Sequence, residues 1–145
     1  MWESTFNPAP YDAHMRVITH ITPHTRVLDV GCNTGQLGEQ VISRLGCYVV
    51  GVEIDPDAAD LARQRLHQVY CSGIEHLPEV MSPKSEKFDC IVAADVIEHT
   101  TWPPNSIRIL KQYLGSSGKL IVSLPNVANY AIRCALATGR FEYGS

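Results

Sequence analysis

The chain lacks a long apolar segment. No uninterrupted run of apolar residues approaches the roughly 20 that a helix needs to cross a bilayer. Met1–Phe6 has neither the basic residues nor the apolar core of a secretory signal. The 145 residues are 45% hydrophobic and 19% charged, a composition typical of one folded domain with its own core. These features predict a cytoplasmic protein that does not enter a membrane.

Positive charge is also scarce. The 12 lysines and arginines are outnumbered by 15 acidic residues, the net charge is −3, and no basic cluster occurs. Nucleic acids and anionic membrane surfaces bind proteins through such clusters. We therefore expect neither of them as the main partner.

Paired cysteine motifs are missing as well. Five cysteines lie far apart in the sequence, several of them in apolar runs, and no Cys-x-x-Cys motif occurs: Cys32, Cys47, Cys71, Cys90 and Cys134. An odd number of cysteines in apolar surroundings favours buried free thiols over a disulfide framework or a zinc site.

Strand-like and helix-like segments alternate from Arg26 onward. Short runs rich in Val and Ile predict strands at Val27–Val30, Tyr48–Val52, Val69–Cys71, Phe88–Ala94 and Lys119–Leu124. Helices are predicted over Gln36–Ile42, from Pro56 to Leu66 with Asp55 as N-cap, from Pro103 to the turn at Gly115–Gly118, and from Pro125 to Leu136. This alternation predicts an α/β fold with a doubly wound parallel sheet.

The first 24 residues are expected to form a lead-in that packs over a domain spanning 25–145. They contain three prolines and a short helical pattern around Tyr11–Ile21.

The segment Val27–Gly35 is the most informative part of the chain. It has the pattern of a buried strand that carries Asp29 and then turns at Gly31 and Gly35. Small residues let a ligand approach the backbone, and amides before a helix attract a negative group. With Asp29 beside it, the turn favours a nucleoside ligand with a charged tail. The alternative is an ordinary turn in which Asp29 caps a backbone amide.

Glu53 and Ile54 follow the second predicted strand. Glu53 lies 22 residues after Gly31, close to the spacing of about 20 expected of an acid that binds ribose hydroxyls. Ile54 is placed to cover a purine face, and a solvated loop acid is the alternative for Glu53.

A dinucleotide is disfavoured by the same turn. Its fingerprint requires Gly-x-Gly-x-x-Gly, whereas this chain has Gly31, Asn33 and Gln36 at those three positions. The glycines that admit a pyrophosphate and pack the helix are missing. Asp29 also suits an ammonium group better than a pyrophosphate.

The stretch Ala93–His99 ends the fourth predicted strand. Ligands of parallel sheets bind beyond the carboxyl ends of the strands, where the strand order reverses. Asp95, Glu98 and His99 are therefore expected near that crevice. His99 is a candidate general base or substrate-positioning group, and a loop-orienting histidine is the alternative.

Four segments in order resemble the class I S-adenosylmethionine-dependent methyltransferases: Val27–Gly35, Gly51–Asp55, Phe88–His99 and Gly118–Asn126. The stretch Leu124–Tyr143 is similar, more narrowly, to the branch related to methionine-biosynthesis protein W. The resemblance implies a Rossmann-like sheet with strand order 3-2-1-4-5. It also implies two further strands, which this chain is expected to lack as a C-terminally truncated domain.

The resemblance also implies a cofactor site for S-adenosylmethionine, whose product is S-adenosylhomocysteine. The residues carried over by position are Asp29, Gly31, Cys32, Asn33, Gly35, Glu53, Ile54, Ile74, Ala94 and Asp95. The family often has Gly-Asp after the third strand, where this chain has Ser72–Glu75. The acid that reads adenine is thus missing or displaced to Glu75, and backbone amides are expected to replace it.

Some relatives hold a divalent metal with an acid-x-x-Glu-His motif, and Asp95–His99 matches its letters. Because no second histidine lies nearby in the sequence, we expect no metal site.

The sequence therefore predicts methyl transfer from S-adenosylmethionine to a small-molecule acceptor, such as a sugar or another hydroxyl or amine metabolite, with His99 as the catalytic residue. A noncatalytic S-adenosylmethionine-binding module that supports a partner enzyme is the alternative, and a nucleotide-dependent oxidoreductase is disfavoured. A homodimer is a further expectation for its assembly.

Overall fold

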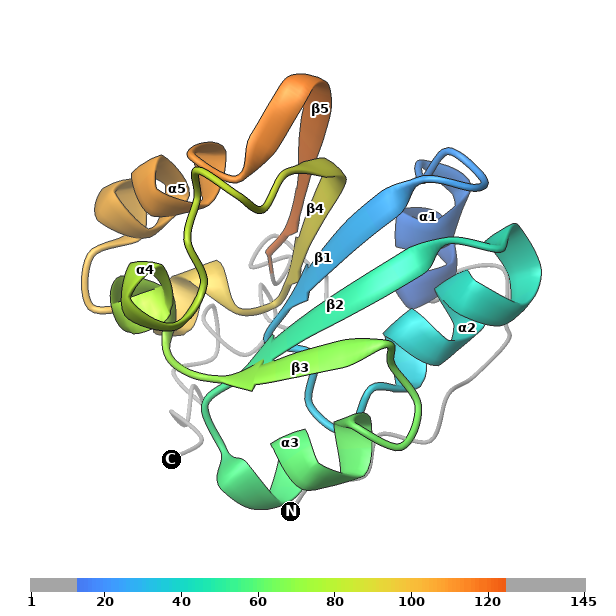
Figure 1. Cartoon of the computed structure of the whole chain (residues 1–145), viewed down its shortest axis with the longest axis horizontal. Coiled ribbons are helices and arrows are strands. Elements are labelled where there is room, and N and C mark those ends of the chain that lie inside the picture. The colour runs from blue at the N-terminus through green and yellow to red at the C-terminus, as the bar shows by residue number, and fades with distance from the viewer. Residues whose placement is uncertain (1–12, 125–145) are drawn as a thin grey trace, which may run out of the picture.

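The computed structural model describes residues 13–124, which form a five-stranded sheet in the order β3-β2-β1-β4-β5 (Figure 1). The strands are β1 Arg26–Val30, β2 Tyr48–Glu53, β3 Gln68–Cys71, β4 Phe88–Ala94 and β5 Leu114–Ser123. All four neighbouring pairs are parallel. The predicted fold class and strand order are confirmed.

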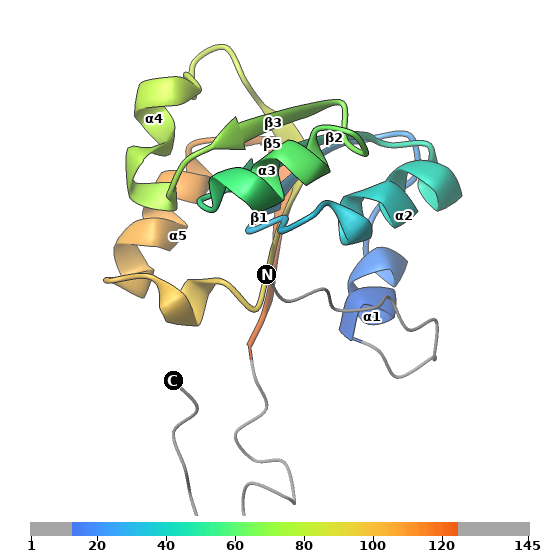
Figure 2. The same cartoon turned by 90° about the horizontal axis from the view of Figure 1, so that it is seen from below.

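Helices cover both faces of the sheet, as the view from below shows (Figure 2). One face carries α1 Ala13–Thr19, α2 Gln36–Leu45 and α3 Pro56–Ala62. The other carries α4 Leu77–Val80, α5 Pro103–Lys111 and the 3-10 helices η1 Ile74–His76 and η2 Ile97–His99.

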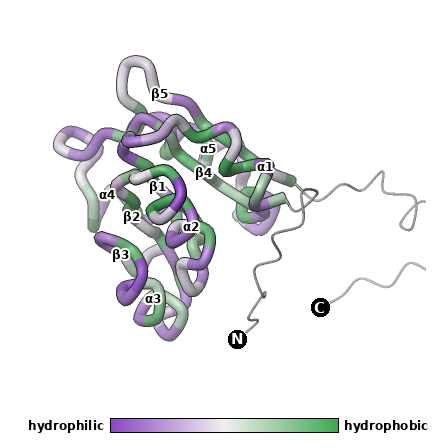
Figure 3. Tube along the Cα trace, turned by 90° about the vertical axis from the view of Figure 1, so that its right-hand side faces the viewer, coloured by the Kyte–Doolittle hydropathy of each residue, from purple (hydrophilic) through white to green (hydrophobic). Residues whose placement is uncertain are grey.

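Alternation along the strands divides the core into two layers. In β1, Val27 packs with the α1–α3 layer, whereas Leu28 and Val30 pack with the α4–α5 layer. Both layers are apolar, and the central strand β4 runs through mostly green segments in Figure 3. A parallel sheet buried on both faces requires this continuous apolar character.

The strand order reverses between β1 and β4. From β1 the chain moves outward to β2 and β3, and it then returns to place β4 on the other side of β1. Asp29 is in register with Gly51 on one side and with Val92 on the other. The carboxyl ends of β1, β2 and β4 therefore meet at one edge, where ligands of such sheets bind.

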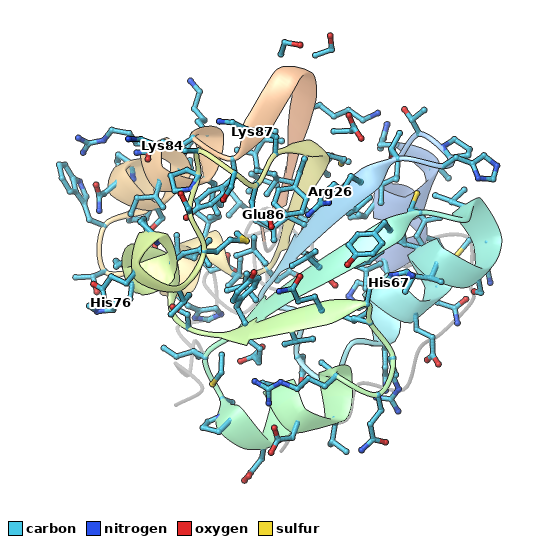
Figure 4. The ribbon with its side chains drawn as sticks, in the orientation of Figure 1. Arg26, His67, His76, Lys84, Glu86 and Lys87 are labelled. Carbon is cyan, nitrogen blue, oxygen red and sulfur yellow. The ribbon has the colours of Figure 1, made fainter. Side chains whose placement is uncertain are left out.

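The opposite ends of the strands are joined by Arg26, which begins β1. Its guanidinium carbon lies 5.1 Å from the ring centroids of both Tyr48 and Phe88, the first residues of β2 and β4. Arg26 also forms an ion pair with Glu86 (Figure 4). These cation–π contacts and the ion pair hold three strands together away from the ligand-binding edge.

The lead-in contains the predicted short helix, α1, and residues 1–12 lie outside the described part of the chain. Val17, Ile18 and Ile21 are buried in the α1–α3 layer. Among the described residues, no helix combines the length and the apolar character needed to cross a membrane.

Several element boundaries differ from the sequence prediction. The helix α3 has the predicted Asp55 cap and Pro56 start, but it ends at Ala62 and continues only as turns to Leu66. The strand β5 ends at Ser123 rather than Leu124. The helix predicted from Pro125 lies outside the described residues.

The predicted turn at 115–118 lies inside β5, as an irregularity of the ladder. Leu114 pairs with Phe88 and Lys119 with Cys90, so four residues of β5 stand opposite one residue of β4. A Cβ on Gly118 would lie 2.9 Å from the Phe88 carbonyl oxygen, so the tight bend needs a glycine there. The structure thus has an irregular stretch of strand where the sequence predicts a turn, because pairing with β4 begins at Leu114, before the glycines.

The prediction of buried free thiols holds for three of the four described cysteines and is wrong for Cys71. Cys32, Cys47 and Cys90 are buried and free, whereas Cys71 is free and exposed. Cys71 ends β3, which is an edge strand of the sheet formed by residues 13–124.

Candidate functional site

The turn between β1 and α2 uses three left-handed backbone positions. Gly31, Asn33 and Gly35 have φ values of +68°, +49° and +85°. The amides of Gly31 and Cys32 both donate to the Val52 carbonyl oxygen, at 2.8 and 3.0 Å. The turn is thereby fastened to the end of β2.

Glu53, the last residue of β2, receives two backbone amides. Its Oε2 accepts from the Asn33 amide at 2.8 Å and its Oε1 from the Asp55 amide at 2.9 Å. The carboxylate therefore links the turn after β1 with the start of α3. Each carboxylate oxygen can accept a further hydrogen bond, so capacity for ligand hydroxyl groups remains.

A cavity of about 340 Å³ opens at the carboxyl ends of the strands. Its lining comprises Val30, Gly31, Val52, Glu53, Ile54, Ser72, Gly73, Ile74, Glu75, Asp95, Val96, His99, Thr100 and Thr101. Ile54 is 72% exposed although it is a large aliphatic residue, whereas Ile74 is buried. The cavity thus combines apolar surface with carboxylates, and it brings Glu53, Ile54, Ile74 and Asp95 together with His99.

A second, smaller cavity of about 50 Å³ lies next to the first. It is lined by His14, Asp29, Gly31, Cys32, Thr34, Gln36, Leu37 and Ala94. Gly31 lines both cavities, so they are adjacent at the start of the turn. Asp29, Cys32 and Ala94, expected at the same ligand as Glu53, are found here.

Two of the expected ligand-binding residues line neither of these cavities. Asn33 contributes its amide to Glu53. At Gly35, an added Cβ would lie 3.2 Å from the Ala62 Cα and 3.3 Å from the Leu66 Cγ, so this glycine lets α2 approach α3.

Asp29 is the most unusual group of the smaller cavity. It is 3% exposed, and its Oδ2 is buried without a hydrogen-bond partner among residues 13–124. Burial, followed by the nearby charge of Glu53, raises the pKa of Asp29 from 3.8 to about 7, against the opposing hydrogen bond from the Gly38 amide. A buried, unpaired carboxylate oxygen is a site for a cationic group.

Asp95 follows β4 with a φ of +52°, a conformation that Asp adopts more readily than most side chains. Three hydrogen bonds tie it to Ser123 of β5. The Ser123 hydroxyl donates to Oδ1 at 2.9 Å, and the Asp95 amide donates to the Ser123 carbonyl oxygen at 3.2 Å and to its hydroxyl oxygen at 3.1 Å. The neighbouring strand therefore orients this carboxylate.

His99 ends η2 at the rim of the larger cavity. Its side chain is 77% exposed, and Nε2 lies 3.8 Å from Oε1 of Glu98. Within the described part of the chain, no three His, Cys, Asp or Glu side chains gather closely enough to hold a metal ion.

Several residues that line the two cavities are not among the ligand-binding residues expected from the sequence. Glu75, considered above as a displaced adenine acid, lies in the wall of the larger cavity, and its Oε1 accepts a hydrogen bond of 3.3 Å from the buried Ser106 hydroxyl on α5. Thr100 and Thr101 follow His99 directly and could have been suggested by that proximity. His14 reaches the smaller cavity from α1, a contact for which the sequence has no local signal.

The comparison with sequence families matches residues 3–143 to the family described as a methyltransferase domain. The chain is 32% identical over 123 residues to a ubiquinone biosynthesis O-methyltransferase of Xanthomonas oryzae, covering 81% of this chain and 49% of the relative. It is 36% identical over 109 residues to the protein of the same name from a Bradyrhizobium species, covering 70% and 40%. The chain therefore spans about half the length, or less, of these curated relatives.

Solved structures share the fold. A TehB-like S-adenosylmethionine-dependent methyltransferase from Corynebacterium glutamicum superposes with a TM-score of 0.61 at 23% identity, covering 75% of this chain and 59% of that one. The plantazolicin methyltransferase BpumL, solved with S-adenosylhomocysteine, gives 0.66 at 17% identity, covering 90% and 48%. The [4+2]-cyclase SpnF gives 0.63 at 24% identity, covering 74% and 42%. One fold thus serves different reactions, so the acceptor must be argued from the site.

Proposed function

The chain belongs to the methyltransferase-domain family, whose cofactor is S-adenosylmethionine, and from this premise we propose that the protein methylates a hydroxyl group of a small-molecule acceptor. One observation carries the proposal. Gly31 lines two adjacent cavities. The smaller one is lined by Asp29, whose Oδ2 has no hydrogen-bond partner among residues 13–124, and the larger one by the anchored carboxylate of Glu53 and by His99.

The residues present suit the cofactor. Asp29 offers its unpaired oxygen to the ammonium group, and Glu53 accepts hydrogen bonds from the ribose hydroxyls. Ile54 and Ile74 provide apolar surface for adenine in the larger cavity. Glu75 and the backbone beside Gly73 face the same cavity and take the place of the missing adenine acid.

When bound, S-adenosylmethionine supplies a methyl group already activated on a sulfonium. The task of the chain is then alignment, and orientation can account for about 7–11 kcal/mol of such a barrier. The packing between the turn and η2 serves this task, since a Cβ on Gly31 would lie only 2.7 Å from Cγ2 of Val96. The turn after β1 and the segment before η2, which both line the larger cavity, are therefore held in a fixed position relative to each other.

His99 accepts the proton of the acceptor hydroxyl at a ring nitrogen. A hydroxyl is a weak nucleophile until a base removes its proton, and a histidine is suited to this near neutral pH. His99 is exposed at the cavity rim, where an incoming acceptor can reach it. Support for a hydroxyl, rather than an amine, comes from the O-methyltransferase names of the curated relatives.

The test replaces His99 with alanine in the full-length protein. We expect the H99A variant to lose at least tenfold in turnover, measured as transfer of a tritiated methyl group to a metabolite extract, while calorimetric affinity for S-adenosylhomocysteine stays within a few-fold. H76A is the matched control, because His76 is also exposed in a 3-10 helix but does not line either cavity. A large affinity loss with normal turnover would refute the role of His99.

The noncatalytic alternative gains no support from these relatives, all of which are named as enzymes. Closer kinship with the protein W-like branch stays a prediction, and so does the cytoplasmic location.

A further inference from the structure

We propose that Gln36 is a second ligand of the cofactor's ammonium group and acts together with Asp29, an inference that rests on the proposed function. The sequence pattern does not mark Gln36 for this role. It shows only that Gln36 stands where dinucleotide-binding turns have a glycine.

Two residues that line the smaller cavity each carry a buried oxygen without a hydrogen-bond partner among residues 13–124. These oxygens are Oδ2 of Asp29 and Oε1 of Gln36. Leaving such an acceptor unsatisfied is unfavourable in a folded protein. Two of them at one small cavity indicate a group that donates hydrogen bonds to both.

The backbone explains why these two residues line one cavity. Asp29 lies on the face of β1 that α2 covers, and Gln36 is the first residue of α2, directly after the left-handed Gly35. A Cβ on Gly38 would lie 2.5 Å from Cδ2 of Leu66 and 3.1 Å from Cγ1 of Val49, so this glycine lets the first turns of α2 pack closely on the sheet beside Asp29. The α2 N-terminus has no side-chain cap that would compete for these groups.

The size and the donor set favour an ammonium group over a metal ion. A volume of about 50 Å³ accommodates the end of a ligand but not its adenosine part. Two side-chain oxygens are too few for Ca²⁺ or Mg²⁺, which take about six or more oxygen ligands. An ammonium group has three N–H donors, so the Asp29 carboxylate can bind its charge while the Gln36 carbonyl accepts a second hydrogen bond.

The experiment compares three ligands by calorimetry on the full-length protein. They are S-adenosylhomocysteine, its deaminated analogue, which keeps the carboxylate, and methylthioadenosine, which lacks the amino-acid end. Gln36→Met keeps the length and helix propensity of the side chain but removes the acceptor. We expect it to weaken S-adenosylhomocysteine binding roughly tenfold, as for a hydrogen bond to a charged group, and to leave the other two ligands within twofold.

The matched control is Gln40→Met, one turn further along α2. Gln40 accepts a hydrogen bond from Arg44 and lines neither cavity, so this variant should bind all three ligands like the parent protein. An equal effect of both substitutions would overturn the inference.

Other outcomes separate the two proposals. Unchanged S-adenosylhomocysteine binding by Gln36→Met, or equal weakening of all three ligands, overturns the role of Gln36 and leaves the proposed function standing. Failure of the parent protein to bind any of the three ligands overturns the proposed function itself. If Gln36→Met does not fold, the Gln36→Glu variant replaces it, because its side chain keeps an acceptor oxygen. This variant should still bind S-adenosylhomocysteine more tightly than the deaminated analogue, and loss of that preference overturns the inference.

Discussion

The Tyr113 hydroxyl donates a hydrogen bond of 2.7 Å to the backbone carbonyl oxygen of Met81. Tyr113 is fully buried beyond the end of α5, and Met81 directly follows α4. The bond joins segments 32 positions apart on one face of the sheet. It therefore ties the end of α4, which directly follows the 3-10 helix with Ile74 and Glu75, to the end of α5.

We expect Tyr113→Phe to lower the free energy of unfolding by about 1–3 kcal/mol, because the buried Met81 carbonyl would lose its partner while the ring packing stays. Urea denaturation measures this. The control is Tyr48→Phe at a ring that is 41% exposed, which should change stability by less than about 0.5 kcal/mol. Equal effects of the two substitutions would show that the hydrogen bond is not the cause.

The raised pKa of Asp29 predicts how stability depends on pH. The folded protein keeps the Asp29 proton up to a pKa of about 7, whereas the unfolded chain releases it near 3.8. The ligand-free protein therefore loses stability as the pH rises from about 4 to 7. Asp29→Asn should remove this fall and be the more stable protein at pH 8, as judged by urea midpoints at pH 5 and pH 8. The exposed Asp57→Asn variant is the control and should keep the parent's pH dependence.

The same group predicts the pH dependence of ligand binding. An ammonium group binds the ionised carboxylate, so affinity for S-adenosylhomocysteine should rise as Asp29 loses its proton with a pKa of about 7. We expect binding to be roughly tenfold weaker at pH 6 than at pH 8 by calorimetry. Methylthioadenosine, which has no ammonium group, should bind with little change over this range. The same pH profile for both ligands would contradict the role of Asp29.

Substitution of Glu53 tests the anchored carboxylate. In Glu53→Gln, only one oxygen remains to serve the two amides of Asn33 and Asp55 and the ligand hydroxyls. We expect affinity for methylthioadenosine and S-adenosylhomocysteine to fall about tenfold or more, since both contain ribose. Because the charge of Glu53 helps to raise the pKa of Asp29, the midpoint of the pH profile should also move to lower pH. An unmoved midpoint would show that the two carboxylates are not coupled.

Gly31→Ala should damage both stability and binding. A side chain at φ +68° costs roughly 1–2 kcal/mol, and the new Cβ would lie 2.7 Å from Cγ2 of Val96. Urea denaturation and calorimetry measure the two effects. Gly73→Ala is the control in the same cavity, because its φ is −75° and its Cβ would make only ordinary contacts from 3.5 Å outward. Its stability should change by less than about 0.5 kcal/mol.

Much of the fold could be predicted because its signals are local. Val- and Ile-rich runs mark the buried parallel strands, and the Asp55–Pro56 pair marks the start of α3. The boundaries that failed depend on contacts between distant segments. At β5, the pairing of Leu114 with Phe88 begins before the glycine turn that local propensity identifies.

The candidate site divides in the same way. Asp29, Gly31 and Glu53 belong to short motifs with a recognisable spacing, and the structure brings them to one edge of the sheet. Gln36 and Ser106 carry no such signal, because their importance lies in what faces them across the fold. Glu75 lies between these two cases. The sequence indicates it as a displaced acid, and the structure places it in the wall of the larger cavity, where it accepts a hydrogen bond from Ser106.

The sequence by itself determined the alternation of strands and helices, the turn after β1 and the class of cofactor, since each follows from residue types at local spacing. The strand order was expected only from the resemblance to the class I methyltransferases. Only the tertiary structure decided that Gly31 lines both cavities and that His14 reaches the smaller one from α1. It also decided that Oδ2 of Asp29 and Oε1 of Gln36 lie buried without partners among residues 13–124. The physical reason is that burial and the raised pKa of Asp29 arise from packing between β1, β2 and α2. Such packing brings together residues whose separation along the chain says nothing of their distance in space.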